Sequence, residues 1–306
     1  MSTAPFQILL YYLYTPLTDV AAYREEHLAL CEGLGLRGRI LIAAEGLNGT
    51  VSGPCAGTAE YMRVLGADER TRGIEFKVDE AEDHVFPKLS VKLRDEMVTL
   101  ALGEEDVSPA ELSGEHLSPA EWRRMMERDD VVLVDARNDY EWELGRFEGA
   151  MLPPVQHFRQ LPEWVRFHRA ELEGKKILTY CTGGVRCEKF SGFLKREGFP
   201  EVFQLDGGIV TYGKDPEVQG EKFEGKCYVF DERIAVEVNR TEGAKVISHC
   251  LHCGVICARY LNCAWSRCNA QHFCCDSCEA TMDRYCGSVC REAALVSLAA
   301  KANESD

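Results

Sequence analysis

The apolar positions in the first hundred residues alternate between strand and helix spacing. Residues 6–14 (FQILLYYLY) form a continuous apolar run typical of a buried strand, and apolar residues then recur at helical spacing over 17–34. The elements expected next are a strand at 39–44, a hairpin turn signalled by Asn48-Gly49, a helix around 57–66, and strands at 74–78 and 91–100. This β-α-β-β-α-β-like order predicts an α+β ferredoxin-like or acylphosphatase-like domain over residues 1–108.

The pattern changes near Pro109, where a connector leads into a predicted helix with Ser118 as N-cap and Glu121 at the third helical position. Three continuous apolar runs follow, and each ends in polar or small residues. They are VVLVDAR (131–137), KKILTYC (175–181) and VFQLDGG (202–208). Such runs are typical of buried parallel strands, and helical segments separate them. Residues 109–219 are therefore predicted to form a doubly wound α/β domain, with ligands at the C-terminal ends of the strands.

Cysteine spacing defines the remaining region, residues 220–306. Ten of the fifteen cysteines lie between 250 and 290, most of them in closely spaced pairs. A tight turn between paired cysteines lets two thiolates reach one zinc ion about 2.3 Å away. Because the region has little apolar sequence of its own, we expect zinc to hold it together, as two ions with eight ligands. The candidate ligands are Cys250, Cys253, Cys263, Cys268, Cys275, Cys278, Cys286 and Cys290, with Cys274, His252 and His272 as alternates. Which pairs share an ion stays open, and unligated thiols or disulfides are the alternatives.

The charge balance limits the partners that the chain can bind. With 35 Lys+Arg against 50 Asp+Glu, the net charge of −15 opposes general attraction to polyanions, so a nucleic acid would need a local basic patch. No apolar run approaches the roughly 20 residues that span a bilayer. The first residues also lack the basic segment of a signal peptide. We therefore expect a cytoplasmic protein that does not bind membranes.

Cys181 stands at the end of a predicted strand, directly before a glycine-containing loop and a helix. The loop consists of Thr182, Gly183, Gly184 and Val185, and Arg186 follows it. Backbone amides at such a helix start converge on one point and stabilise an anion, so we expect Cys181 to ionise easily. The alternative is an inert buried thiol. Cys187 is either a resolving thiol for an oxidised Cys181 or a bystander.

Three motifs together resemble the rhodanese pattern. They are DARNDYEWELGRFEGA (135–150), the loop CTGGVR (181–186) and LDGGI (205–209). The resemblance implies a rhodanese domain in which Cys181 is the catalytic nucleophile and Asp135 and Arg186 flank the pocket. It implies supporting roles for Arg137 and Glu141. A purely structural role for Asp135, as a cap, is the alternative.

A resemblance to one particular family covers nearly the whole chain. The segments ILIAAEGLNGTVSG (40–53), VKLRDEMVTL (91–100) and YCTGGVRCEKF (180–190), with the paired cysteines of 250–290, resemble the bacterial oxygen-dependent tRNA uridine hydroxylases. This resemblance implies an oxidoreductase that converts uridine at wobble position 34 to 5-hydroxyuridine, with O2 as co-substrate and Cys181 as the catalytic cysteine. It also implies the tRNA anticodon region as partner. No flavin or nicotinamide fingerprint is visible, and no protein partner is indicated.

A tRNA ligand requires a basic surface, and Arg159, Arg166 and Arg169 are the candidate contacts. His168, Arg186, Lys189, Lys195 and Arg196 are further cations near the predicted pocket, although each could be an ordinary solvated charge. Phe158, Trp164 and Phe167 could stack an unpaired base or pack in the core.

Two other functions fit the same sequence. The first is a rhodanese-type sulfurtransferase that passes sulfane sulfur through a Cys181 persulfide, since the loop suits that chemistry equally well. The second is a non-enzymatic module in which the cysteine-rich region binds a protein and the rhodanese domain is a scaffold. An intact Cys181 loop argues against the scaffold, because a scaffold does not need an activated thiolate.

Overall fold

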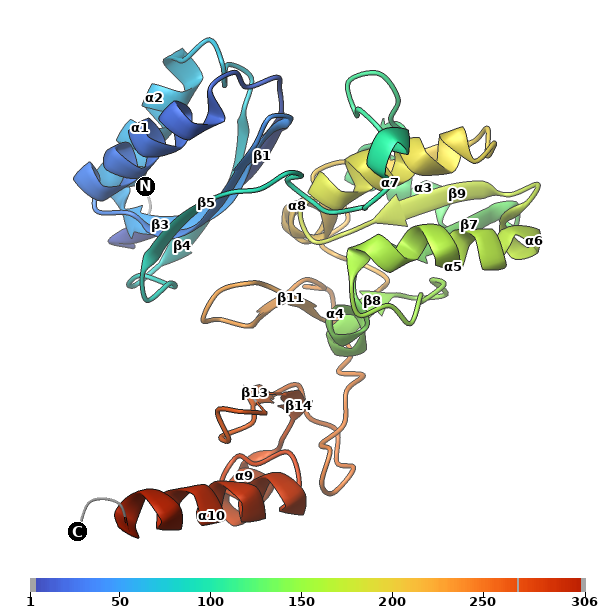
Figure 1. The fold of residues 1–306 in the computed structure, drawn as a ribbon. Helices are drawn as coiled ribbons and strands as arrows, with labels where there is room; N and C mark the ends of the chain where they lie inside the picture. The colour runs from blue at the N-terminus through green and yellow to red at the C-terminus, as the bar shows by residue number, and fades with distance from the viewer. Residues whose placement is uncertain (1–3, 269, 304–306) are drawn as a thin grey trace.

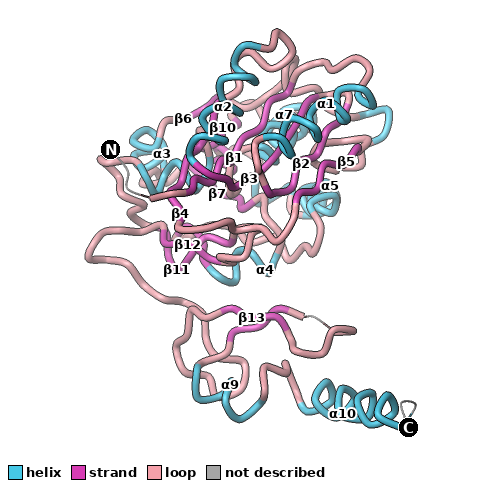
Figure 2. The backbone as a smooth tube through the Cα atoms, turned by 90° about the vertical axis from the view of Figure 1, so that its left-hand side faces the viewer, coloured by secondary structure: helices cyan, strands magenta, loops and turns pink. Residues whose placement is uncertain are grey.

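The computed structural model describes residues 4–268 and 270–303. Residues 1–3, 269 and 304–306, which belong to the first and third predicted regions, lie outside the described residues. Two globular parts lie side by side, and a smaller cysteine-rich part lies at one end of the molecule (Figure 1, Figure 2). No helix among the described residues is both long and apolar enough to cross a membrane.

The N-terminal part is a five-stranded sheet with two helices on one face (Figure 1). The strand order is β4-β1-β3-β2-β5, and every neighbouring pair is antiparallel except β2 and β5. Apolar residues from alternate strand positions pack against α1 and α2 and form the core. The elements are β1 (Phe6–Tyr14), α1 (Val20–Gly33), β2 (Arg37–Ala43), β3 (Gly46–Pro54), α2 (Cys55–Ala67), β4 (Glu75–Ala81) and β5 (Leu89–Leu93). The predicted α+β fold is confirmed.

Two local predictions are wrong. Asn48 and Gly49 do not form the hairpin turn but lie inside β3, because the β2–β3 register pairs Ala43 with Gly46. Gly49 is needed there because an added Cβ would lie 2.5 Å from the hydroxyl of Tyr11. The strand predicted over 91–100 ends at Leu93. The Arg94 amide still bonds to the Ile42 carbonyl of β2, but the amides of Met97 and Leu100 bond to carboxylates.

The second part is a parallel sheet, β6-β10-β9-β7, with helices on both faces. Trp122, Ile209 and Tyr212 fill one face, and Leu161, Phe190 and Phe193 fill the other, which confirms the doubly wound α/β prediction. Ser118 and Glu121 form the predicted capping box. The elements are 3₁₀ helix η1 (Gly103–Glu105), β6 (Glu115–Leu117), α3 (Pro119–Met125), β7 (Val131–Asp135), α4 (Asp139–Leu144), 3₁₀ helix η2 (Phe158–Gln160), α5 (Leu161–Phe167), α6 (Arg169–Leu172), β9 (Lys176–Tyr180), α7 (Val185–Arg196), β10 (Val202–Leu205) and α8 (Gly208–Lys214).

Residues from 223 onward begin as part of this second body. Strand β11 (Phe223–Tyr228) pairs with β8 (Gly145–Phe147) and with β12 (Ala235–Glu237), and Phe223 and Cys227 are buried in the same core as Trp122. The cysteine-rich part follows, with β13 (Tyr260–Asn262), β14 (Gln271–Phe273), α9 (Asp276–Met282) and α10 (Ser288–Asn303). Its attachment is aromatic, since Tyr260 packs on Tyr228.

Candidate active site

Cys181 lies at the C-terminal end of β9, at the start of the loop that leads into α7, and only 1% of its surface is exposed. The backbone amide of Gly184 donates to Cys181 Sγ at 3.2 Å. Gly184 has a φ of +104°, which an L-residue with a side chain rarely adopts. Gly208, with a φ of +69°, supports the loop from below, where an added Cβ would lie 2.7 Å from the Cys181 carbonyl oxygen.

The surroundings of Cys181 favour its thiolate. Burial opposes ionisation, but a hydrogen bond from the Cys187 thiol, the positive charge of Arg186 and the backbone amides of Arg186 and Cys187 outweigh it. Together they lower the pKa of Cys181 to about 5. For Cys187, burial and the neighbouring Cys181 raise the pKa well above its usual range. The geometry therefore gives the two cysteines different states at neutral pH, a thiolate at Cys181 and a thiol at Cys187.

Arg186 is held by Glu141, which has no exposed surface. The two terminal nitrogens of Arg186 donate to the two carboxylate oxygens of Glu141 at 2.5 and 2.8 Å. One of these nitrogens also lies 3.4 Å from the Thr182 hydroxyl. Burial raises the pKa of Glu141, but the guanidinium of Arg186 outweighs that effect and lowers it overall. Helix α4 thus fixes a cation next to the thiolate.

Asp135 was expected either to flank the pocket or to have a purely structural role, and its contacts are those of a structural residue. Both of its carboxylate oxygens accept from Arg137, at 2.9 and 2.6 Å, and neither residue has exposed surface. Arg137 also donates to the Gly145 carbonyl at 2.6 Å. Asp135 is not among the residues that line the cavity at Cys181. Its geometry is that of a buried structural pair, whereas Glu141 is the carboxylate that reaches Arg186.

A cavity of about 270 Å³ opens above Cys181, and both globular parts line it. One wall is the face of the N-terminal sheet that points away from α1 and α2, where side chains alternate along β1, β2 and β3. The lining residues are Leu10, Tyr12, Arg39, Leu41, Asn48, Gly49, Thr50, Phe86, Met97, Val98, Cys181, Thr182, Gly183, Val185, Arg186 and Phe230. The loop glycines allow this close approach, since a Cβ on Gly183 or Gly184 would meet Leu10 or Tyr12.

The N-terminal contributors to the cavity were missed from sequence. The available signal was a period of two: Tyr12 on β1, Arg39 on β2 and Asn48 on β3 share one face of the sheet, while the intervening residues are apolar and face the helices. The same face also carries Leu10 and Leu41, and apolar side chains on the face opposite the helices indicate a partner surface, although they do not say which one.

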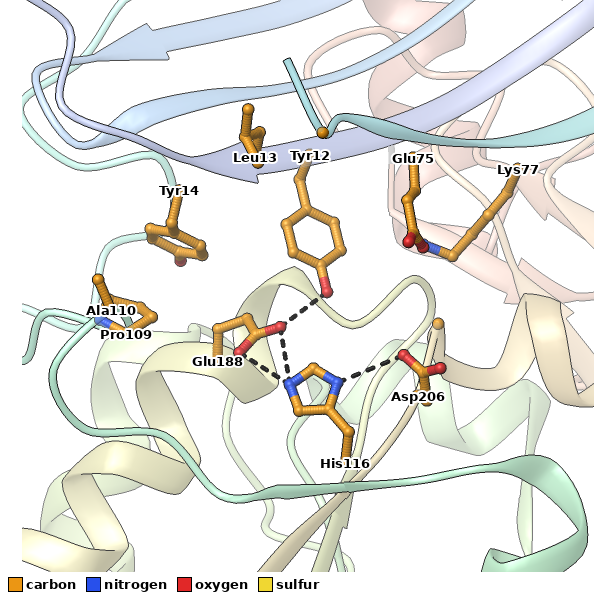
Figure 3. A pocket seen from close by; sticks show the side chains of 12 residues that line it. Tyr12, Leu13, Tyr14, Glu75, Lys77, Pro109, Ala110, His116, Glu188 and Asp206 are labelled. Carbon is orange, nitrogen blue, oxygen red and sulfur yellow. Dashed lines mark hydrogen bonds and ion pairs between the residues drawn. The ribbon is translucent and has the colours of Figure 1, made fainter. Parts of the chain in front are cut away.

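Tyr12 also borders a second cavity of about 360 Å³ (Figure 3). Its hydroxyl donates to Glu188 at 2.9 Å, and His116 lies between Glu188 and Asp206, at 3.3 Å from each (Figure 3). Hydrogen bonds to Asp206 and then to Glu188 raise the pKa of His116 to about 10. A chain of polar contacts therefore runs from the Cys181 cavity to the second cavity.

Lys189 joins the two globular parts. Its ammonium lies 2.9 Å from Glu45, 2.9 Å from Glu96 and 2.7 Å from Asp106, and the side chain is completely buried. Glu45 belongs to the β2–β3 turn, and the other two carboxylates belong to the linker that follows β5. Because Lys189 is buried, it cannot contact an RNA, although the sequence made it a candidate for such a contact.

The predicted basic surface lies on η2, α5 and α6 and does not border the Cys181 cavity. Arg159 is exposed, Arg166 pairs with Glu197 at 2.8 Å, and Arg169 donates to the Glu197 carbonyl at 2.9 Å. Among the aromatic residues, Phe158 is in the core, Trp164 stacks on His168, and Phe167 is 83% exposed.

The eight predicted zinc ligands fall into two groups of four cysteines. Cys250, Cys253, Cys275 and Cys278 form one group, and Cys263, Cys268, Cys286 and Cys290 form the other. Within each group the sulfur atoms lie within 4.8 Å of one another. Four thiolates around one point are a donor set that suits a tetrahedral, borderline-soft ion, so both groups can hold a metal. The pairs interleave along the chain, which the sequence left open.

Comparisons with known proteins agree with this architecture. Family models match residues 6–97 as a UPF0176 acylphosphatase like domain, residues 118–215 as a Rhodanese-like domain and residues 224–291 as Rhodanase C-terminal. A parallel sheet with helices on both faces and a cysteine at a strand end, followed by a loop that stabilises its thiolate, defines a rhodanese-type protein.

The relatives specify the family. Proteins called tRNA uridine(34) hydroxylase are 53% identical in Shouchella clausii, over 94% of this chain and 88% of theirs, and 54% identical in Bacillus pumilus, over the same shares. The Bacillus mycoides protein of that name is 51% identical over 95% of this chain and 90% of its own. The chain belongs to the tRNA uridine(34) hydroxylase family, as its sequence motifs predicted.

Proposed function

We propose that the protein hydroxylates uridine 34 of tRNA to 5-hydroxyuridine, with O2 as the oxidant and Cys181 as the nucleophile. The observation that carries this proposal is a Cys181 thiolate at the base of a cavity walled by two domains, in a member of the tRNA uridine(34) hydroxylase family. Cavities of about 150 Å³ take up a benzene ring. The roughly 270 Å³ above Cys181 therefore suits one pyrimidine base.

The thiolate activates the uracil ring by addition. Attack of Cys181 Sγ on C6 forms a C–S bond and moves the electron pair of the C5–C6 double bond to C5. C5 then bonds to O2 and, with one proton, becomes a hydroperoxide. Two thiols of an external reductant, which join as a disulfide, supply the two electrons that cleave the O–O bond, so that a hydroxyl stays on C5 and the other oxygen atom leaves as water. Loss of the C5 proton and departure of the thiolate restore the double bond. The amide of Gly184 that donates to Sγ supports both steps, because it stabilises the attacking and the leaving thiolate.

The walls of the cavity supply contacts for the nucleotide. Phe230, which is exposed at the cavity wall, offers a ring on which an unstacked base can rest. Arg39 makes no ion pair with any described residue, so its guanidinium is available for a phosphate or a uracil oxygen. The candidates for contacts farther along the tRNA are still Arg159, Arg166 and Arg169. Because tRNA acts in the cytoplasm, we expect the protein to act there. Neutralising all three should weaken tRNA binding and flatten its salt dependence.

The cysteine-rich region is proposed to bind zinc. Two Zn²⁺ ions, one in each group of four cysteines, would hold together a segment with a small apolar core. Their role is structural, because four thiolates leave no open coordination position.

A nucleoside assay tests the function directly. The purified protein is incubated in air with tRNA that carries an unmodified uridine 34, and the digested nucleosides are examined by mass spectrometry. We expect a gain of one oxygen on uridine that disappears with Cys181→Ala and under anaerobic conditions. If Cys181→Ala still hydroxylates tRNA, the nucleophile is wrong. If the zinc-replete protein yields no product but transfers sulfur from thiosulfate to cyanide, the sulfurtransferase alternative replaces the proposal.

A further inference from the structure

A third group of metal-binding side chains lies in the cysteine-rich part, separate from the two groups of four cysteines. Its members are His252, His272 and Cys274, and one ligand atom from each lies within 4.8 Å of the others. The two imidazole rings are 5.7 Å apart between centroids and stand nearly perpendicular, at 81°. This arrangement brings three donors of the kinds that bind transition metals around one point.

The histidine nitrogens at this point are buried without partners. His272 is 95% buried, and neither of its ring nitrogens has a hydrogen-bond partner among the described residues. The Nε2 atom of His252 is also buried and unpartnered within the described part of the chain. Buried polar atoms are nearly always satisfied, and one that is not destabilises the fold. A ligand at this point would satisfy one nitrogen of each ring.

The two histidines do not serve as hydrogen-bond donors to the neighbouring cysteine sulfurs. An imidazole N–H beside a zinc-bound cysteine often donates to its sulfur, yet neither ring donates to any sulfur in the described ranges. Cys274 is also fully buried, its thiol donates to the Cys275 carbonyl at 3.6 Å, and it belongs to neither group of four. The three side chains therefore form a set of their own.

We propose that His252, His272 and Cys274 bind a third Zn²⁺ ion. Nitrogen and thiolate donors suit zinc, and ligands about 2.0–2.3 Å from a tetrahedral ion lie about 3.3–3.8 Å from one another. The present separations of up to 4.8 Å need only a small contraction to reach that geometry. Three protein ligands leave the fourth position open, and the His252 side chain is only partly buried, so water or a small thiol can reach it.

Charge favours an ion at this place. His252 lies between Cys250 and Cys253, and Cys274 directly precedes Cys275, so the third site shares two chain segments with the first group of four. Zn²⁺ with four thiolates carries a net charge of −2, whereas Zn²⁺ with one thiolate and two neutral imidazoles carries +1. The two centres therefore attract each other. The third ion also secures β14, whose Phe273 packs on Tyr260 against the rhodanese domain.

Metal content and ligand type test the proposal. The full-length protein is purified without chelators, and its zinc is counted by elemental mass spectrometry. We expect three ions per chain, falling to two in His252→Ala and in His272→Ala, while the exposed neighbour His249→Ala keeps three. Two ions in the unaltered protein would overturn the third site. Three ions that persist in both variants would overturn it as well, because the third ion would then bind elsewhere.

A second measurement does not depend on how the variants fold. The unaltered chain is loaded with ¹¹³Cd²⁺, whose NMR shift distinguishes four-sulfur sites from sites with nitrogen ligands. We expect two signals in the four-sulfur range and one upfield signal from the two-histidine, one-cysteine site. Four-sulfur signals alone would contradict the third site and leave the two larger groups intact. An upfield signal alone would support the third site and refute the four-cysteine sites.

Discussion

Arg186 presents both of its terminal nitrogens to the two carboxylate oxygens of Glu141, at 2.5 and 2.8 Å, in the wall of the Cys181 cavity. Glu141 is buried, so Glu141→Gln leaves a buried guanidinium without its counter-charge. Breaking a buried pair in this way costs roughly 3–5 kcal/mol. We expect that loss in the free energy of unfolding, measured by urea denaturation. Glu143→Gln, at an exposed position of the same helix, should change it by less than about 0.5 kcal/mol. Equal effects of the two variants would show that the pair contributes little.

The ionisation of Cys181 predicts an unusual pH profile. Because its pKa is lowered to about 5, the thiolate is present above that pH and is lost as pH falls through it. The alkylation rate of the Cys181 peptide, followed by mass spectrometry, should rise with a midpoint near pH 5 instead of the usual pKa of about 8.5. Cys187→Ala removes a hydrogen-bond donor and should move the midpoint upward. A midpoint near 8.5 in the unaltered protein would contradict the loop as an activating device.

Removal of Lys189 should loosen the contact between the two globular parts. Lys189→Met leaves three carboxylates facing one another without the ammonium that now lies within 2.9 Å of each. We expect a loss of about 3 kcal/mol in stability and faster proteolysis of the linker after β5. Hydroxylation should fall with it, because the N-terminal wall of the cavity is no longer held in place. Lys195→Met, on the same helix but partly exposed, is the control. An unchanged linker cleavage rate would show that other contacts dock the two parts.

The support beneath the loop can be tested at a single glycine. In Gly208→Ala the new Cβ would lie 2.7–2.8 Å from the Cys181 carbonyl, the Gly184 amide and the Thr182 carbonyl, and the loop must shift. Displacements of about 1 Å can cost about 100-fold in rate, and we expect a loss of that order in hydroxylation. Gly174→Ala has a similar positive φ but no atom within 4 Å of the new Cβ. If Gly174→Ala is equally impaired, backbone strain alone accounts for the loss.

Metal removal should unfold the cysteine-rich part and spare the rest. Its apolar contacts are few, so chelation with EDTA should unfold the backbone around the exposed residues Arg259, Arg267 and Arg284 and allow trypsin to cleave there. Alkylation of Cys181 should be unaffected, since its loop belongs to the rhodanese core. Added zinc should restore resistance to trypsin. A digestion pattern that EDTA does not change would mean that the fold of this part does not depend on metal.

The sequence was most informative where the residues of the candidate site are neighbours in the chain. Cys181, its loop and Arg186 are consecutive residues, and the two strand-end glycines that support them follow a third apolar run, so local patterns were enough. The pairing of Asp135 with Arg137 was less predictable. Both stand at a strand end, but which carboxylate reaches Arg186 depends on how α4 packs, and the structure gives that contact to Glu141.

Contacts between distant segments escaped prediction for a physical reason. A period of two along β1 to β3 shows that the second sheet face carries Leu10 and Leu41 beside its polar residues, but it does not tell which surface covers that face. The same limit applies to Lys189. From sequence, its charge was interpreted as solvated or as an RNA contact, because its three carboxylate partners are distant in the chain and two of them lie in the linker. The misplaced hairpin turn has another cause, because Asn48-Gly49 is a strong turn signal that the β2–β3 register overrides.

The sharing of the Cys181 cavity between two domains separates reactivity from recognition. The rhodanese loop generates the thiolate from its own amides and charges, whereas Tyr12, Arg39 and Asn48 shape the space in front of it from another fold. A change of substrate could therefore arise by altering one sheet face, with the nucleophile untouched. One domain supplies the nucleophile and the other selects the substrate, so the interface between them is where new specificities can be engineered.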